Sequence, residues 1–73
     1  MDVARLKAMA NQIARNLAVQ GDEAAVAAMV QHVEDFWDPR MKGAMLATDD
    51  QGLDPIAAQA IAKLAAASRG LGG

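Results

Sequence analysis

Residues 36–41 read Phe36-Trp37-Asp38-Pro39-Arg40-Met41, and this stretch decides how the chain divides into helices. The sequence holds no other Phe or Trp, and only one further Pro. A proline disfavours helical backbone at the residue before it, so a helix that arrives from the N-terminal side must end here. Asp38 can cap a new helix with its carboxylate, and Pro39 suits the first helical position, where no backbone N–H is needed. The stretch therefore predicts a corner between two helices, with both aromatic rings at that corner.

Two helices are predicted on the N-terminal side of this corner. Apolar residues recur at steps of three and four from Val3 to Leu17, which is typical of one helical face, and Gly21 suits the end of that helix. A second apolar stripe follows and reaches the aromatic pair, with Asp22 placed to cap its helix. We expect these helices at about 3–20 and 23–37. Because the connection between them is short, they are predicted to form an antiparallel hairpin.

The C-terminal half repeats the Asp-Pro device. A brief helix is expected at 39–47, although Gly43 inside it costs about 1 kcal/mol relative to Ala. After a polar loop, Asp54 caps and Pro55 begins a last helix, expected at 55–69, with a frayed tail at 70–73. The whole chain, residues 1–73, is thus predicted to be one all-α domain, a small three- to four-helix bundle.

Length and composition narrow the possible functions. The chain has 73 residues, no Cys, a net charge of −2 and a pI of about 5.0. A chain this short buries only a thin core, and 18 of its apolar residues are Ala, which has little surface to bury. Nucleic-acid binding would require clustered Lys and Arg, and a membrane span would require about 20 consecutive apolar residues. We therefore expect a cytoplasmic protein that contacts neither nucleic acid nor membrane.

No catalytic or metal-binding set is expected. His32 is the only His, and the chain has neither Cys nor Tyr to accompany it as a metal ligand or acid–base partner. Ser68 and Thr48 are the only hydroxyl side chains, and neither has a His nearby in the sequence. The acidic loop near Asp50 lacks the spacing of an EF-hand. The sequence predicts that this chain is not an enzyme by itself and binds no cofactor or metal.

The corner also holds the candidate binding residues. Trp and Arg are enriched at the energetic centres of protein interfaces, which makes Trp37 and Arg40 candidates for gripping a partner. Met41 and Met45 follow, and methionine is common at adaptable binding surfaces. The alternative is that Trp37 packs in the core of the bundle, since a small helical core commonly needs one large side chain. Both interpretations stay open at this point.

Three stretches together resemble a known family. Met9-Ala10-Asn11-Gln12-Ile13-Ala14, then residues 36–41, then Gly52-Leu53-Asp54-Pro55 are similar to the delta subunit of NAD-dependent, molybdenum-containing formate dehydrogenase. The resemblance spans about residues 5–65, and the middle stretch is its most specific part.

The resemblance implies a non-catalytic accessory subunit of a cytoplasmic complex. Such a subunit would dock on the large (alpha) subunit, in company with beta and gamma subunits, and support assembly or stability. The complex would carry a molybdenum or tungsten pterin, iron–sulfur clusters, FMN and NAD, none of them bound by this chain. On the first expected helix, Asn11 and Gln12 are either further polar contacts to the partner or solvated residues, and both interpretations stay open. The alternatives are a transient chaperone for insertion of the molybdenum cofactor and, more remotely, a small helical interaction or regulatory module.

Overall fold

The computed structural model describes the backbone of residues 2–72 and the side chains of residues 2–67. Within this range the chain forms four α-helices and one short 3-10 helix, and it contains no strand. In chain order these are α1 (Val3–Leu17), η1 (Ala18–Gln20), α2 (Asp22–Phe36), α3 (Pro39–Ala47) and α4 (Pro55–Gly72). The prediction of a small all-α bundle is confirmed.

The Asp-Pro helix starts are formed as local chemistry dictates. The Asp38 carboxylate accepts a hydrogen bond from the backbone N–H of Met41 at 2.9 Å, and Pro39 occupies the first turn of α3. The Asp54 carboxylate accepts from the N–H of Ile56 at 3.2 Å, and α4 begins at Pro55. Each carboxylate satisfies an N–H that has no partner inside its helix.

The prediction that Asp22 caps the second helix is wrong. The cap position is Gly21, with a φ of 96°, and no side chain bonds to the free N–H groups there. Glycine adopts this positive φ cheaply, so the chain turns one residue earlier than expected and Asp22 becomes part of the first turn. The carboxylate there is still favoured by the positive end of the helix dipole.

The last helix is longer than the sequence suggests. It continues to Gly72, past the expected end at 69, and Gly73 lies outside the described residues. A glycine weakens a helix by about 1 kcal/mol relative to Ala but does not prevent it. The expected frayed tail at 70–73 is therefore helical as far as residue 72.

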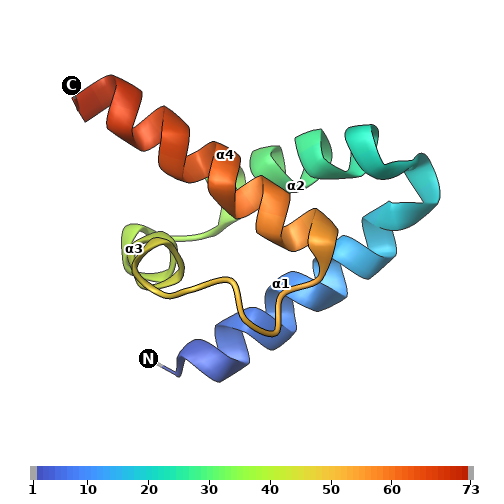
Figure 1. The fold of residues 1–73 in the computed structure, drawn as a ribbon, viewed down its shortest axis with the longest axis horizontal. Helices are drawn as coiled ribbons and strands as arrows, with labels where there is room; N and C mark the ends of the chain where they lie inside the picture. Colours follow the sequence, from blue (N-terminus) through green and yellow to red (C-terminus); the bar gives the residue numbers. More distant parts are fainter. Residues whose placement is uncertain (1, 73) are drawn as a thin grey trace.

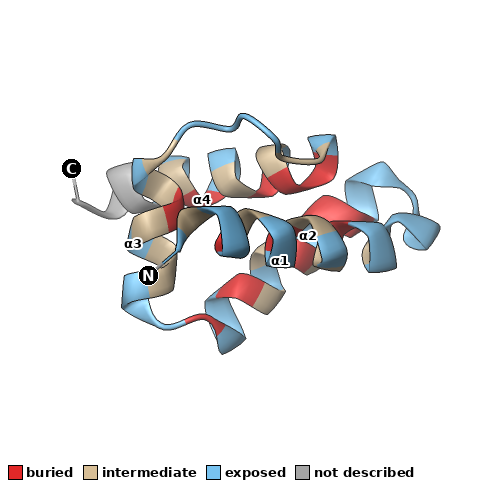
Figure 2. Ribbon diagram, turned by 90° about the horizontal axis from the view of Figure 1, so that it is seen from below, coloured by how far each residue is buried: buried red, intermediate tan, exposed pale blue. Residues whose placement is uncertain are grey.

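The helices pack around one core in which α2 and α4 share the most extensive contact (Figure 1). α1 touches each of the other three helices, and α3 closes the end of the bundle near the N-terminus. Buried residues line the faces where the helices meet (Figure 2). The largest of the fully buried side chains are Met29, Met45 and Val33.

The turn between α1 and α2 lies at the opposite end of the molecule from α3 (Figure 1). η1 and Gly21 make this turn, and α1 contacts α2 after it. The antiparallel hairpin that the sequence predicts for these two helices stays a prediction. No helix among the described residues is both long enough and apolar enough to cross a membrane.

Candidate functional site

The two neighbouring aromatic residues at the corner have opposite environments. Trp37 is only 5% exposed and belongs to the core, whereas Phe36 is 74% exposed. Trp37 has extended backbone, with φ −88° and ψ 136°, because α2 ends at Phe36 and the chain turns toward α3. Because the helical backbone ends between these two residues, the Trp37 side chain enters the core while the Phe36 side chain stays exposed on α2.

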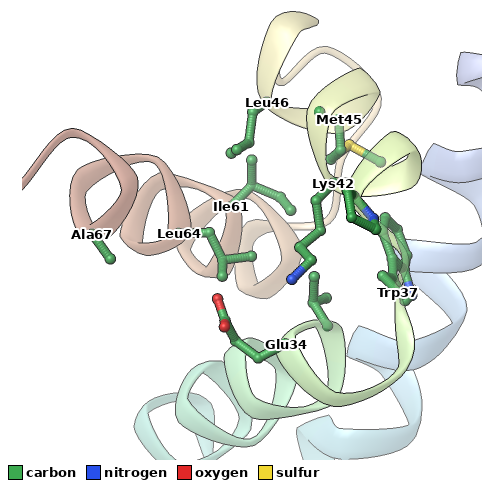
Figure 3. Close-up of a pocket in the computed structure, with 11 residues that line it drawn as sticks. Glu34, Trp37, Lys42, Met45, Leu46, Ile61, Leu64 and Ala67 are labelled. Carbon is green, nitrogen blue, oxygen red and sulfur yellow. The ribbon is translucent and has the colours of Figure 1, made fainter. Parts of the chain in front are cut away.

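Beside Trp37 the surface is hollowed between three helices (Figure 3). We call this hollow the α2–α3–α4 groove, and its volume is about 380 Å³. α2 and the corner contribute one wall, α3 the second and the middle of α4, residues 61–67, the third. The lining residues are Val33, Glu34, Trp37, Pro39, Lys42, Gly43, Met45, Leu46, Ile61, Leu64 and Ala67.

The groove has apolar walls and charged edges. Every buried side chain among the described residues is hydrophobic, so no buried polar group points into the groove. Among the residues whose side chains the structure describes, the charged ones that line it are Glu34 on α2 and Lys42 on α3. Figure 3 shows their side chains reaching toward one another over the opening, but the single ion pair within 4.0 Å among the described side chains lies elsewhere.

That ion pair belongs to a second feature, where α1 holds the loop between α3 and α4. Asn11 donates from Nδ2 to the Gly52 carbonyl at 2.8 Å and accepts at Oδ1 from the Asp54 N–H at 2.7 Å. Lys7 Nζ donates to Asp49 Oδ1 at 2.9 Å and to the Gln51 carbonyl at 2.7 Å. We call these four bonds the α1–loop clamp.

The clamp also affects the ionisation of one loop carboxyl, that of Asp49. The hydrogen bond from Lys7 lowers the pKa of the Asp49 carboxyl below 3.8, helped by the N–H of Gln51 and by the positive charge of Lys7. Asp49 Oδ1 accepts that N–H at 3.1 Å. The clamp therefore favours the ionised form of Asp49, which is the form that pairs with Lys7.

The six predicted binding residues do not form one surface. Trp37 and Met45 line the groove and are buried, so a partner can reach them only through it. Arg40 is exposed and Met41 is half-buried against the core, and neither lines the groove. Asn11 and Gln12 lie on α1, where Asn11 is committed to the clamp and the exposed Gln12 bonds only to Asn16.

The sequence does not predict the environments of three residues, one at the corner and two at the edge of the groove. The sequence predicts Phe36 in the same apolar stripe as Trp37, but only Trp37 is buried, because the helix ends between the two residues. Glu34 and Lys42 were not singled out, and no local pattern marks them, because their proximity depends on how α2 and α3 pack.

The described side chains do not assemble a metal site. They contain no group of three or more His, Cys, Asp and Glu residues placed to hold an ion. The ring of His32 lies 4.9 Å from that of Phe36 on the same helix, at the solvent-facing side of α2. This pairing provides no acid–base partner for the imidazole.

Comparison with known proteins identifies a family. A protein-family model described as the NADH-dependent formate dehydrogenase delta subunit FdsD matches residues 5–61 of the 73. No curated protein and no solved structure matches the chain. The match covers most of α1, all of α2 and α3 and the first part of α4, and therefore includes the corner, the clamp and most of the groove.

Proposed function

The chain belongs to the family of NADH-dependent formate dehydrogenase delta subunits, and from this premise we propose that it is a non-catalytic accessory subunit of that enzyme. It docks on the large, cofactor-bearing alpha subunit of a cytoplasmic complex and supports its assembly or stability. The family match over residues 5–61 is the observation that carries this proposal.

The chemistry of the chain supports a binding role over a catalytic one. The buried side chains are all hydrophobic within the described residues, so the groove offers no acid, base or nucleophile sheltered from water. The molybdenum or tungsten pterin, the iron–sulfur clusters, FMN and NAD belong on the alpha, beta and gamma subunits in this proposal. The delta subunit contributes binding free energy, which stabilises whichever state of the partner it binds.

The corner between α2 and α3 supplies exposed groups for docking. Arg40 and Phe36 are exposed next to the half-buried Met41, which places a cation and two apolar side chains on neighbouring turns. Arg and aromatic side chains commonly supply the largest contributions to an interface. Trp37 and Met45 act from beneath, as the floor of the groove.

The proposal is tested by affinity purification of the full-length chain from its native cells, with partner stoichiometry measured by mass spectrometry. We expect recovery of the formate dehydrogenase subunits in equal amounts with this chain. If only the alpha subunit is recovered, in less than equal amount and poor in cofactor, this would instead indicate a transient maturation chaperone. Absence of all dehydrogenase subunits would refute both roles.

Point variants then locate the contact. Arg40→Ala removes an exposed cation without touching the core, and we expect it to weaken recovery of the alpha subunit. Arg5→Ala is the matched control, since Arg5 is an exposed cation on α1. Equal recovery with both variants would exclude the corner from the interface.

A further inference from the structure

We propose that the α2–α3–α4 groove receives an amphipathic helix of a partner subunit, which points an acidic side chain at Lys42 and a basic side chain at Glu34. This inference rests on the proposed function and names the chemistry of the partner segment. An apolar row on that helix fills the groove between the two charged residues. Helix-in-groove binding of this kind uses side chains spaced three and four residues apart.

The make-up of the groove favours a protein segment over a small molecule. Sites for small ligands usually combine an apolar pocket with a few polar groups that point inward and fix the orientation of the ligand. Here the buried residues of the described chain are all hydrophobic, and the charges stand only at the edge. An apolar centre with a polar rim is the usual anatomy of a protein–protein interface.

The charges at the edge specify what the occupant must carry. α3 has the basic residues Arg40 and Lys42 and no acidic residue, while the last turn of α2 has Glu34 and Asp35 and no basic residue. An occupant that enters between Glu34 and Lys42 removes water from both charges. Burying a charge without a partner is costly, so a purely apolar segment would bind poorly there. A segment with one acidic and one basic edge satisfies both charges and can lie in only one direction.

Gly43 gives the occupant room to approach. It lies in the middle of α3, where glycine costs about 1 kcal/mol relative to Ala, and it lines the groove. A Cβ added at this position would meet no atom within 4 Å, so the packing of the chain itself does not require a glycine. The missing side chain leaves the backbone of α3 open to close contact from outside.

The dimensions of the groove agree with a short helix. The nine residues of α3 form one wall, which at 1.5 Å per residue is about 13 Å long. About two and a half turns of a partner helix fit along this length, enough for two or three apolar side chains on one face. The volume of about 380 Å³ accommodates side chains of this kind.

The test co-expresses the full chain with the alpha, beta and gamma formate dehydrogenase subunits and measures the share of complex that each variant retains. Lys42→Glu is expected to reduce the share of complex that is retained about tenfold or more, because the new carboxylate repels the acidic side chain of the partner. Lys63→Glu is the control, an equal change of charge at an exposed α4 position outside the groove. We expect the control to be retained like the wild-type chain.

The double variant Glu34→Lys with Lys42→Glu separates two explanations. If the two side chains matter only through their attraction for one another, exchanging them restores retention. If each meets a fixed charge on the partner, the double variant stays impaired, which is the result that we expect.

Gly43→Leu tests the approach of the partner without changing any charge. This variant should melt no lower than the wild-type chain by circular dichroism, because Leu favours the helix over Gly and the Cβ that it adds meets no atom within 4 Å. It should nevertheless lose the complex, whereas Ala24→Leu, at an exposed position in the first turn of α2 outside the groove, should keep it.

The outcomes distinguish the two proposals. Retention of the wild-type chain together with all groove variants would overturn the groove proposal and leave the proposed function standing. Failure of the wild-type chain to join the complex would refute the proposed function and the groove proposal with it. A dimer of the isolated chain that Gly43→Leu dissociates, measured by light scattering, would replace the partner helix by a second copy of this chain.

Discussion

The clamp between α1 and the α3–α4 loop makes a strong prediction about stability. Asn11→Ala removes both bonds of the amide, the one to the Gly52 carbonyl and the one from the Asp54 N–H. Each hydrogen bond contributes about 0.5–1.5 kcal/mol net, and a buried group left without a partner costs about 1–3 kcal/mol. Because the Asp54 N–H is only partly buried, we expect a loss near the middle of this range, about 2 kcal/mol.

This loss is large for a chain of this size. A lone core below about 80 residues rarely supplies more than about 3–5 kcal/mol, so Asn11→Ala removes a substantial part of the whole. For a domain of this length 1 kcal/mol shifts the melting temperature by about 4–8 °C, which predicts a decrease of about 8–16 °C. Thermal and urea unfolding followed by far-UV circular dichroism measure both quantities.

Gln12→Ala is the matched control, one residue along the same helix. Its side chain is exposed and bonds only to Asn16 at 3.2 Å, a pair four residues apart on the helix surface. Such pairs contribute about 0.2–0.5 kcal/mol, so the melting temperature should change by only a few degrees. Equal stability of the Asn11→Ala and Gln12→Ala variants would refute the structural role of the clamp and return Asn11 to the list of possible partner contacts.

Three further outcomes are expected. Trp37→Ala should unfold most of the isolated chain, since removing a buried Trp side chain costs about 3–5 kcal/mol. Phe36→Ala removes an exposed ring and should change the unfolding free energy by less than about 0.5 kcal/mol, and circular dichroism measures the helix content of both variants. Asp38→Ala should cost about 1 kcal/mol in urea unfolding through loss of the α3 cap, and no change would contradict the capping role. The pKa of Asp49 is lowered in the folded chain, so the ionised carboxylate stabilises the fold above pH 3.8, and this contribution is lost as the pH falls through the lowered pKa. The difference in unfolding free energy between the wild-type chain and Lys7→Ala should therefore become smaller in acid, as urea unfolding at several pH values would measure.

Features that depend on neighbours in the chain were predictable. The Asp-Pro pairs begin α3 and α4 because the carboxylate and the pyrrolidine ring act within three residues of one another. The apolar spacing along α1 and α2 likewise predicts helices without reference to the rest of the fold. One local prediction is nevertheless wrong: Gly21, and not Asp22, takes the N-cap position of α2.

The role of Asn11 was not predictable in this way. Its two partners lie 41 and 43 residues away, so nothing near it in the sequence marks it as a structural residue. A polar side chain on the polar face of a helix has the same local pattern whether it meets a partner protein, water or a distant loop. Asn11 and Gly52 lie in two of the stretches that carry the family resemblance, and only the fold shows that they are hydrogen-bonded to one another.

By itself the sequence determined the helical class, the positions of the corners and, through its resemblance, the family, because each depends on residue order over short ranges. The tertiary structure alone decided that Trp37 is buried while Phe36 is exposed, and that Glu34 and Lys42 flank one groove. The reason is physical: the spacing of residues along a helix sets which of them share a face, but what covers that face is set by how the helices cross. Those crossings join parts of the chain that no local pattern connects.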